Sequence, residues 1–257
     1  MAALLSVTGV SRSFGGVFAV REVSVEVAPG ELHGVIGPNG AGKSTLFKLI
    51  GGQLRAQGGT ITYAGRRIDR LPPHRRARLG IAVVFQGASI FRGMTALENV
   101  MVGAHAITRS GFGSGVLRLP RHRREERDIR HRAGKALERV GLADWAGRPA
   151  EALPLGQQRA VQVARALCGE PRLLLLDEPA AGLRAAEREA LAQLIEELRA
   201  GGLTMLKIEH DVAFVTRLAD RVTVLDLGRV IAEGTPAEIR ADPEVIAAYL
   251  GQEVVPR

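Results

Sequence analysis

The sequence contains little cysteine and few aromatic residues. Cys168 is the one cysteine among 257 residues. It excludes an internal disulfide and suits a reducing compartment, and we expect it to be a small buried group on a helix. Aromatic residues make up 4% of the chain, so Leu, Val, Ile and Ala must supply most of the hydrophobic core.

Long hydrophobic runs are also absent from the sequence. No run approaches the roughly 20 apolar residues that a membrane-spanning helix needs. The first residues, Met1–Leu5, lack the basic segment and the long apolar stretch of a secretory signal. We therefore expect any role at a membrane to depend on a partner protein.

Positive charge is concentrated in two segments of a chain whose net charge is +8. Residues 66–78 contain six Arg and one Asp, and residues 118–135 contain eight basic and three acidic side chains. Such segments can meet nucleic acid or anionic lipid. Neither carries the interleaved aromatic residues that stack on bases. We therefore expect stretches that face solvent or lipid headgroups, and no nucleic-acid partner.

Hydrophobic periodicity predicts alternating strands and helices. The expected strands are Leu4–Val10, Val23–Val27, Leu32–Ile36, Gly58–Tyr63, Ile81–Phe85, Leu173–Leu176, Leu203–Ile208 and Val222–Leu225. Gly15-Gly16 predicts a turn between the first two strands. Helices are expected over Ser44–Leu54 and before Gly201, and further helices begin at Thr235 and Asp242.

The middle of the chain has a different pattern. From about Gly87 to Leu167, helical segments are separated by glycine and arginine, and Thr108–Pro120 contains three glycines. This composition predicts a flexible insertion within a helical block. The sequence therefore predicts one α/β unit with a helical block inserted in its middle.

The residues after the third predicted strand match the phosphate-binding loop at every fixed position. They are Gly37, Pro38, Asn39, Gly40, Ala41, Gly42, Lys43 and Ser44. In such a loop, backbone N–H groups cradle phosphates and the following helix adds its positive end. Lys43 would offset phosphate charge, and the Ser44 hydroxyl would ligate Mg²⁺. The alternative is a chance glycine-rich turn, but the strand before it and the helix after it favour the phosphate loop.

A second site narrows the reaction, because kinases, GTPases and motors all use phosphate loops. The leucine run Leu173–Leu176 ends in Asp177 and Glu178. Asp177 would hold the Mg²⁺ shell, and Glu178 would orient or deprotonate the attacking water. The two acids could instead cap the next helix. The Asn-Lys-x-Asp motif of GTPases is absent from the sequence, so the two sites together predict ATP hydrolysis.

With these motifs, the chain resembles the ATP-binding subunits of ABC transporters over nearly its whole length. The resemblance implies that Phe14 stacks on adenine and that His210 is a switch histidine at the γ-phosphate. It also implies that Gln86 contacts Mg²⁺ and water, and that Thr45 joins the nucleotide-binding loop. The expected catalytic residues are then Glu178, His210 and Gln86, and the expected Mg²⁺ ligands are Ser44, Gln86 and Asp177.

The resemblance implies a P-loop NTPase fold with a mixed, mainly parallel sheet, an N-terminal antiparallel β region and an inserted helical subdomain. Residues 1–257 would form one ABC ATPase domain. Its RecA-like core would span about 1–86 and 168–257, and the helical subdomain about 87–167, with a basic insertion at about 105–132.

A further motif lies where the family has its signature, just before a predicted helix. It consists of Leu153, Pro154, Leu155, Gly156 and Gln157. The resemblance implies that this segment completes the nucleotide site of a second ATPase subunit. The family has serine where this chain has Pro154, and it has Asp or Asn where this chain has Arg184. Proline offers neither a hydroxyl nor an N–H group.

Both departures lie on the part of the chain that would serve its neighbour. They motivate a hypothesis in which the chain pairs with a different ATPase subunit. One competent site would use this chain's phosphate loop, and a weakened site would use the partner's. The alternative is that the N–H groups of Gly156 and Gln157 suffice and that Pro154 is tolerated.

Within the family, several stretches most resemble the ATPases of branched-chain amino acid importers, of the type called LivG. They are Phe14-Gly15-Gly16, the Arg-rich insertion, Gly156–Arg159, Glu178–Leu183, Gly234–Ile239 and Ala248–Gly251. The expected protein is a dimeric ATPase on the cytoplasmic face of the inner membrane, with two permease subunits and, indirectly, a substrate-binding protein. The alternatives are a urea, amide or lipid system, or a soluble ABC protein that acts on ribosomes or DNA.

Overall fold

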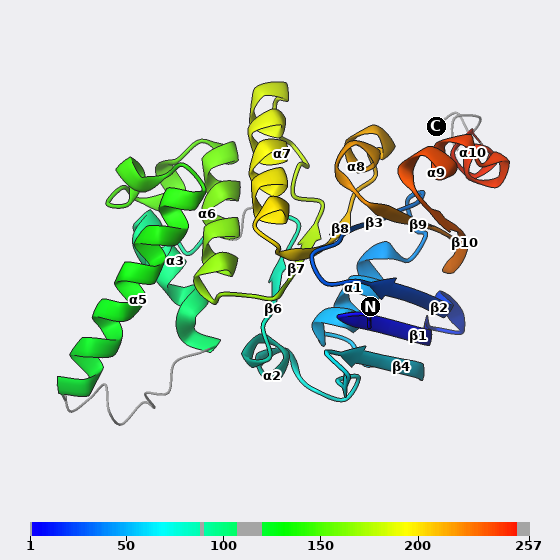
Figure 1. Cartoon of the computed structure of the whole chain (residues 1–257), viewed down its shortest axis with the longest axis horizontal. Helices are drawn as coiled ribbons and strands as arrows, with labels where there is room; N and C mark the ends of the chain where they lie inside the picture. Colours follow the sequence, from blue (N-terminus) through cyan, green and yellow to red (C-terminus); the bar gives the residue numbers. More distant parts are fainter. Residues whose placement is uncertain (1, 88–89, 107–119, 251–257) are drawn as a thin grey trace.

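A computed structural model describes residues 2–87, 90–106 and 120–250. Two sheets organise this part of the chain (Figure 1). The first is antiparallel, with the strand order β2-β1-β4-β5. Its strands are β1 (Leu5–Phe14), β2 (Val17–Val27), β4 (Gly58–Tyr63) and β5 (Arg66–Arg67).

The second sheet has the order β10-β9-β3-β8-β7-β6. All neighbouring strands in it are parallel except β10, which pairs antiparallel with β9 at one edge. The central strands β3, β7 and β8 are buried along their whole length, as expected for parallel strands covered on both faces. The strands are β3 (Leu32–Ile36), β6 (Ile81–Val84), β7 (Leu173–Asp177), β8 (Thr204–Ile208), β9 (Arg221–Asp226) and β10 (Arg229–Gly234).

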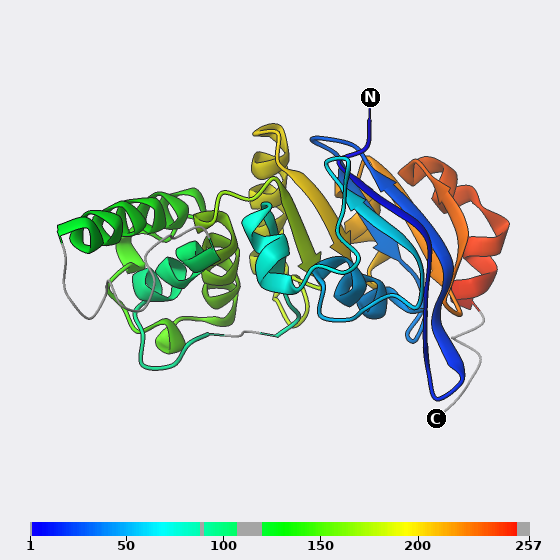
Figure 2. The ribbon, with the colours of Figure 1, turned by 90° about the horizontal axis from the view of Figure 1, so that it is seen from below.

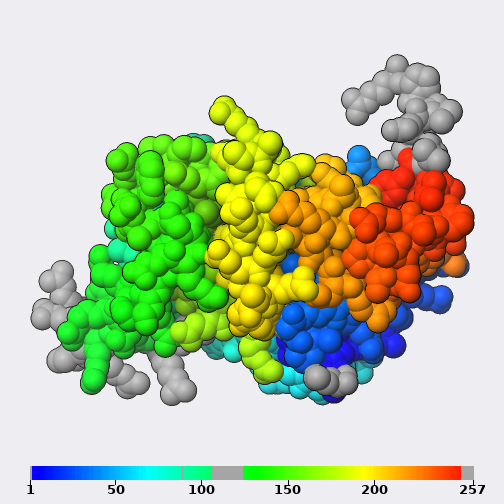
Figure 3. Space-filling model, turned by 45° about the horizontal axis from the view of Figure 1, so that its top comes forward, coloured from blue at the N-terminus to red at the C-terminus, as the bar shows by residue number. Residues whose placement is uncertain are grey.

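Helices cover the second sheet and form a separate block at one end of the molecule. The block lies opposite the antiparallel sheet and the C-terminal helices (Figures 1 and 2). Its helices are α3 (Ala96–Met101), η1 (Val102–Ala106), α5 (Pro120–Arg139), η2 (Ala143–Trp145), η3 (Ala150–Ala152) and α6 (Leu155–Cys168). The others are α1 (Lys43–Gly51), α2 (Pro73–Arg78), α7 (Ala185–Ala200), α8 (Val212–Leu218), α9 (Pro236–Ala241) and α10 (Pro243–Leu250). In the space-filling view, α7 forms a ridge between the block and α8 (Figure 3).

The leucine run of β7 explains how the layers are held together. Leu173 and Leu175 join the core that contains α1 and the antiparallel sheet, whereas Leu174 and Leu176 join the core beneath α6, α7 and α8. Each buried leucine side chain stabilises the fold by about 1.5–3 kcal/mol. Successive side chains of a strand point to opposite faces, so this run holds both layers and places its last residue, Asp177, at the carboxyl edge of the sheet.

The two first strands are longer than the sequence predicts. We expected Leu4–Val10 and Val23–Val27, but pairing continues to Phe14 and back from Val17. The alternation is interrupted by register shifts near Gly9, whose φ is +57°, and this irregularity hides the strands from a period-two pattern. The predicted turn at Gly15-Gly16 is confirmed.

Two other predicted elements are too long. The helix expected to reach Leu54 ends at Gly51, because Gly52 adopts a left-handed φ of +86° and closes the last turn. The strand expected to reach Phe85 ends at Val84. The helix starts at Thr235 and Asp242 are confirmed, since each side chain accepts a hydrogen bond from a first-turn backbone N–H group.

The first basic segment is not wholly a surface stretch, and this corrects the prediction. Arg76 is 1% exposed, although Arg75 before it and Arg78 after it are exposed. Its guanidinium donates to the carbonyls of Leu49 at 2.7 Å and Ile50 at 2.6 Å, at the end of α1. An arginine run thus conceals one residue that caps the helix after the phosphate loop.

Most of the second basic segment forms α5. The predicted flexible insertion, Thr108–Pro120, falls almost entirely on residues 107–119, which lie outside the described residues. Cys168 lies buried on α6 as expected, and burial raises the pKa of its thiol to about 11. Within the described ranges, no helix is both long enough and apolar enough to cross a membrane. The boundaries of the helical subdomain stay a prediction.

Candidate active site

The glycine-rich loop connects the end of β3 to the start of α1. Gly37, Gly40 and Gly42 have φ values of +152°, +82° and +99°, which side chains rarely adopt. Added side chains would also collide with their surroundings. A Cβ at Gly37 would lie 2.0 Å from the Leu225 carbonyl oxygen, and one at Gly42 would lie 2.1 Å from that of Ala19. The loop is therefore packed against β9 and β2 and requires glycine at both positions.

Lys43 curls back over this loop. Its Nζ donates to the carbonyl oxygens of Gly37 at 2.6 Å and Pro38 at 2.9 Å, and the side chain is 5% exposed. Burial lowers the pKa of the ammonium, an effect that the nearby carboxylates of Glu178 and Asp177 oppose. The structure thus holds a cation against the loop backbone, where a phosphate group would need charge compensation.

The other predicted loop residues surround the start of α1. Ala41 is buried, and its carbonyl accepts a hydrogen bond from Gly228 N at 3.1 Å in the β9–β10 turn. Asn39 is exposed, and Ser44 and Thr45 lie in the first helical turn, where Ser44 is half-buried. The helix therefore presents its N-terminal end and two hydroxyls beside the loop, as a phosphate site requires.

Asp177 is the last residue of β7 and is 7% exposed. Its Oδ1 is buried without a hydrogen-bond partner among the residues that the structure describes. Burial, followed by the negative charge of Glu178, raises the pKa of this carboxyl group. An orphaned carboxylate oxygen beside a phosphate loop fits a divalent cation, which would supply the missing partner.

A cation here would not be held by a cluster of protein carboxylates. Within the described part of the chain, no group of three or more His, Cys, Asp or Glu side chains could hold a metal ion. Mg²⁺ commonly uses one or two protein ligands together with phosphate oxygens and water. Asp177 and the Ser44 hydroxyl match that kind of site.

Glu178 lies at the point where three strand ends meet. Its carboxylate accepts a hydrogen bond from Gln86 Nε2 at 2.6 Å, and His210 Nδ1 lies 4.0 Å from the same oxygen. Gln86 follows β6, Glu178 follows β7 and His210 follows β8. The structure therefore brings together all three predicted catalytic residues, although they come from distant parts of the sequence.

The backbone of Glu178 is strained. Its φ is +44°, in the left-handed region, and its N–H group donates to the Ile208 carbonyl at 3.1 Å. Holding a side chain other than glycine in this region costs about 1–3 kcal/mol, and such strain is often found at functional sites. The Glu178 side chain is 17% exposed and that of His210 is 55% exposed, so the cluster is open to water.

Phe14 lies at the end of β1, and its ring is 47% exposed. The Arg12 guanidinium lies 4.9 Å from the ring centroid, so a cation already covers part of the ring. The hairpin that carries Phe14 continues into β2, where the Ala19 carbonyl touches the phosphate loop at Gly42. This placement is compatible with adenine stacking, which stays a prediction.

The signature segment is not brought to the chain's own phosphate loop. It leads into α6, which lies apart from α1 in both ribbon views (Figures 1 and 2). Leu153 is 4% exposed, Leu155 is 39% exposed, and Pro154 occupies the N-cap without a side-chain hydrogen bond. Gly156 N donates to Glu187 Oε1 at 3.1 Å. The helix start is therefore satisfied from α7 rather than by the residue that the family places at the cap.

Comparison with known families shows to which family the chain belongs. A family model described as "ABC transporter" matches residues 20–181, which is more than half of the chain. The chain belongs to the ABC transporter ATP-binding family. A second model, "Branched-chain amino acid ATP-binding cassette transporter", matches residues 229–255 of this ABC ATPase.

Curated relatives cover nearly the whole ABC ATPase chain. It is 44% identical over 250 residues to the high-affinity branched-chain amino acid transport ATP-binding protein LivG of Salmonella typhimurium, covering 97% of this chain and 98% of the relative. It is 42% identical to BraF of Pseudomonas aeruginosa, with the same two coverages. Identity to the lipopolysaccharide export protein LptB of Acidithiobacillus ferridurans is 36%, covering 98% and 99%.

Solved structures share the fold. A crystal structure of the ADP conformation of an ABC transporter cassette has a TM-score of 0.85 and 31% identity, covering 98% of this chain and 100% of that one. The protein cbiO1 from Clostridium perfringens, part of an ABC transporter complex, has a TM-score of 0.80 and 29% identity, covering 99% and 96%. The predicted ABC ATPase fold is therefore confirmed, and so is the prediction that the chain is an ATPase.

Sequence reasoning missed two acidic residues of this ABC ATPase. Glu187 accepts from Arg184 N at 2.9 Å through Oε2 and from Gly156 N through Oε1, so one carboxylate serves the starts of two helices. A glutamate at the third position of a helix commonly accepts from the N-cap backbone N–H group, so its place in α7 could have revealed the first contact. Glu209 lies 1% exposed beside Lys207, and no sequence pattern predicts a buried pair there.

Proposed function

We propose that this ABC ATPase energises the import of branched-chain amino acids through membrane permease subunits, from the cytoplasmic face of the membrane. The observation that carries the proposal is the cluster of Gln86, Glu178 and His210 beside an intact phosphate loop. The substrate class is supported by the C-terminal match to the branched-chain cassette model and by the names of LivG and BraF.

The chain's own residues account for the hydrolytic step. The loop amides and Lys43 would hold the ATP phosphates. Glu178 would orient the attacking water and accept its proton, while Gln86, hydrogen-bonded to Glu178, keeps the carboxylate in position. His210, whose Nδ1 lies 4.0 Å from the same carboxylate oxygen, would contact the γ-phosphate. Mg²⁺, when bound by Asp177, Ser44 and Gln86, would neutralise charge on the phosphates.

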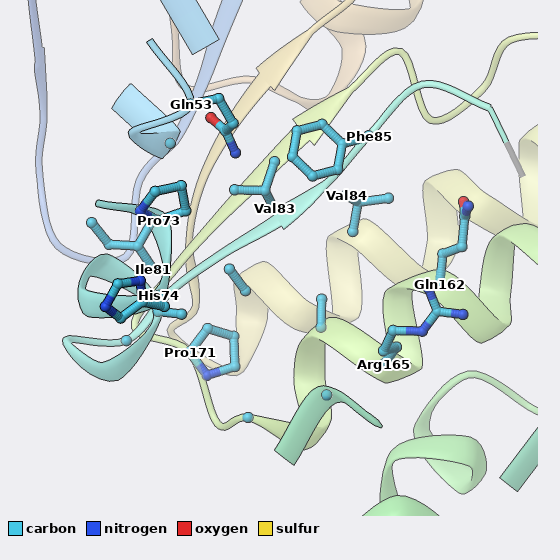
Figure 4. A pocket seen from close by; sticks show the side chains of 17 residues that line it. Gln53, Pro73, His74, Ile81, Val83, Val84, Phe85, Gln162, Arg165 and Pro171 are labelled. Atoms are coloured by element: carbon cyan, nitrogen blue, oxygen red, sulfur yellow. The ribbon is translucent and has the colours of Figure 1, made fainter. Parts of the chain in front are cut away.

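A groove next to β6 offers a docking site for a permease subunit. Its volume is about 370 Å³, and β6, α2, η1 and α6 line it. The side chains of α2 and α6 lie on opposite sides of β6 (Figure 4). The floor is apolar, with Val83 and Phe85, whereas His74, Gln162 and Arg165 supply polar groups at the sides. This composition fits a short amphipathic helix from a membrane partner.

The groove is directly connected to the catalytic cluster. Gln162 on the groove wall donates through Nε2 to the carbonyl of Gly87 at 2.7 Å. Gly87 follows Gln86, which contacts Glu178 at 2.6 Å. Two hydrogen bonds and one peptide unit therefore separate a docked segment from the catalytic carboxylate. We infer that docking and hydrolysis are coupled along this route.

Filling the groove tests the docking proposal. Ala166→Glu would place a carboxylate in the groove, whereas Ala247→Glu puts the same change on an exposed position of α10. We expect only the first variant to lose co-purification with membrane permeases, with ATP binding retained in both. Full co-purification of Ala166→Glu would contradict docking at this groove.

We also propose that the chain acts in an asymmetric dimer with a different ATPase subunit. A related cassette has been solved as a dimer, with a TM-score of 0.76 and 26% identity. Pro154 lacks the hydroxyl that the family signature would offer to a neighbour's nucleotide. The Gly156 N–H group already donates its hydrogen bond to the Glu187 carboxylate, and the negative charge of this carboxylate would repel a phosphate group. Loss of a hydrogen bond to a charged group weakens binding or rate by about 10- to 150-fold.

The asymmetry makes a clear kinetic prediction. Glu178→Gln in this chain should abolish most ATP turnover of the assembled transporter, because it disables the competent site. The matching substitution in the partner subunit should cost much less. Equal losses from the two substitutions would exclude the asymmetric arrangement.

Transport itself is tested by uptake in cells that depend on this chain. We expect wild-type cells to accumulate labelled leucine, with competition by valine and isoleucine and none by urea. Cells that carry Glu178→Gln should lose this uptake. Unchanged leucine uptake after loss of the chain would exclude the proposed substrate class.

A further inference from the structure

A buried pair of opposite charges lies next to the cluster of Gln86, Glu178 and His210. Lys207 lies in β8 and Glu209 follows the strand, and their side chains are 0% and 1% exposed. Lys207 Nζ lies 3.8 Å from Glu209 Oε1 and has no hydrogen-bond partner among the described residues. Burying two charges in this way is costly, because their attraction repays the lost hydration only when the pair is close and hydrogen bonds satisfy both groups.

Glu209 connects the two turns that carry the catalytic residues. Its Oε1 accepts a hydrogen bond from Ala180 N at 3.3 Å, in the turn that follows Glu178. One residue earlier, the Ile208 carbonyl accepts from Glu178 N at 3.1 Å. One residue later stands His210. The Glu209 side chain therefore links the turn after Glu178 to the turn that carries His210. The backbone hydrogen bond between Glu178 and Ile208 links the same two turns.

Lys207 is the counter-charge of this carboxylate. Its ammonium also lies 3.5 Å from the centroid of the Phe214 ring, which supplies a cation–π contact from α8. The Arg188 guanidinium of α7 lies 5.6 Å from the same ring and pairs with Asp211 at 2.8 Å. The ammonium is thus held between an acidic group and an aromatic face.

Other ionisable groups act on the pair from both sides. Asp211 attracts the ammonium and Arg188 repels it. On the side of Glu209, His210 favours its charged form and Glu178 disfavours it. The buried Arg159 guanidinium of α6 also interacts with this carboxylate. The catalytic carboxylate and the buried pair therefore influence each other electrostatically as well as through the backbone.

We propose that Lys207 and Glu209 form a buried positioning pair, which holds Glu178 and His210 in register for ATP hydrolysis. Lys207 keeps Glu209 ionised, and ionised Glu209 holds the Ala180 amide. The inference rests on the proposed role of Glu178 in hydrolysis. It assigns an indirect role in catalysis to two residues whose side chains are buried.

The charge state of the pair is sensitive to pH near neutrality. Burial lowers the pKa of Lys207 to about 7, and burial raises the pKa of Glu209. When Lys207 loses its proton, Glu209 loses its nearest counter-charge and its own pKa rises further. We therefore expect turnover of the wild-type chain to fall as the pH rises through this range.

The test uses the full-length chain and a cycle of variants in which charge and hydrogen bonding are changed separately. Lys207→Met and Glu209→Gln each remove one charge of the pair and leave the other without its nearest counter-charge, and a displacement of the cluster by about 1 Å would lower kcat by roughly 10- to 100-fold. The double variant removes both charges of the pair and keeps an acceptor for Ala180 N. We expect the double variant to recover at least half of the loss in log kcat that the single variants show. We also expect its turnover not to fall as the pH rises.

Two further variants complete the design. Glu209→Leu removes the acceptor, so Lys207→Met should not rescue it. Glu189→Gln makes the same amide change in the exposed Arg217–Glu189 pair between α7 and α8 and should leave kcat unchanged. In all folded variants the KM for ATP should stay within about threefold of wild type, because the pair does not touch the phosphate loop.

Three results would overturn the proposal. They are unchanged kcat in both single variants, losses that simply multiply in the double variant, or losses that appear in KM rather than kcat. The proposed role of Glu178 is tested separately. If that role is wrong, Glu178→Gln will retain wild-type turnover, whatever the Lys207 and Glu209 variants show.

Discussion

Replacing Arg76 by methionine tests how a basic surface segment supports the nucleotide site. The guanidinium donates to the carbonyls of Leu49 and Ile50 in the last turn of α1, and to those of Leu71 at 2.9 Å and Asp69 at 3.2 Å. The side chain is 1% exposed, and burial lowers its pKa to about 10, so it remains charged at neutral pH. Methionine retains most of the apolar stem and removes every donor.

The expected loss follows from these contacts. Hydrogen bonds that involve a charged group contribute about 1.5–3 kcal/mol each, but such contributions overlap when they share one group. Each buried carbonyl left without a donor costs about 1–3 kcal/mol, so with overlap the four carbonyls together should cost about 3–5 kcal/mol. We expect this loss in the free energy of unfolding. For a chain of this size it corresponds to a fall of roughly 10 °C in Tm.

Chemical and thermal denaturation of the full chain measure this loss. Arg75→Met is the matched control, because Arg75 is the preceding residue of α2 and is exposed. We expect it to change the free energy of unfolding by less than about 0.5 kcal/mol. A loss below about 1 kcal/mol for Arg76→Met, or equal losses for both variants, would refute the assignment of Arg76 as the cap of α1.

Three further predictions concern the loop, the buried lysine and the thiol. Gly37→Ala should abolish ATP binding, because the new Cβ would lie 2.0 Å from the Leu225 carbonyl oxygen. Gly40→Ala should only weaken binding, because there is open space around Gly40. Equal effects of the two substitutions in a nucleotide titration would contradict the packing argument. Between about pH 7, the pKa of Lys207, and the usual lysine value, the unfolded chain binds more protons than the folded chain. The free energy of unfolding should therefore rise with pH there by up to about 1.4 kcal/mol per unit, and denaturation of Lys207→Met should lack this slope. Because burial raises the pKa of Cys168 to about 11, a thiol reagent at pH 8 should label it only after unfolding.

The parts of the site that the sequence predicted are those encoded in short, local motifs. The phosphate loop follows a strand and precedes a helix, so the pattern alone placed its glycines, Lys43 and Ser44. Asp177 and Glu178 end a leucine run of the kind that is buried in a parallel sheet, and the structure confirms that strand. Gln86 and His210 were placed by resemblance to a family, and the fold brings both to Glu178.

What the sequence could not show depends on which polar side chains become buried. Arg76 stands in an arginine run that favours a surface assignment, and its partners are carbonyls, which leave no pattern in sequence. Lys207 interrupts an apolar strand and pairs with a residue two positions along. The length of β1 was missed because a bulge at Gly9 breaks the alternation. In each case tertiary contacts decided against the local pattern.

The most direct test of the account measures ATP binding and ATP turnover on the same Glu178→Gln chain. Glutamine keeps the shape of the side chain and an acceptor for Gln86 Nε2, and it removes the base that would take the proton of water. We predict that kcat falls by roughly 10²- to 10⁴-fold while the Kd for ATP changes by less than about threefold. Retained turnover, or loss of ATP binding together with turnover, would contradict the assignment of Glu178 as the catalytic carboxylate beside the phosphate loop.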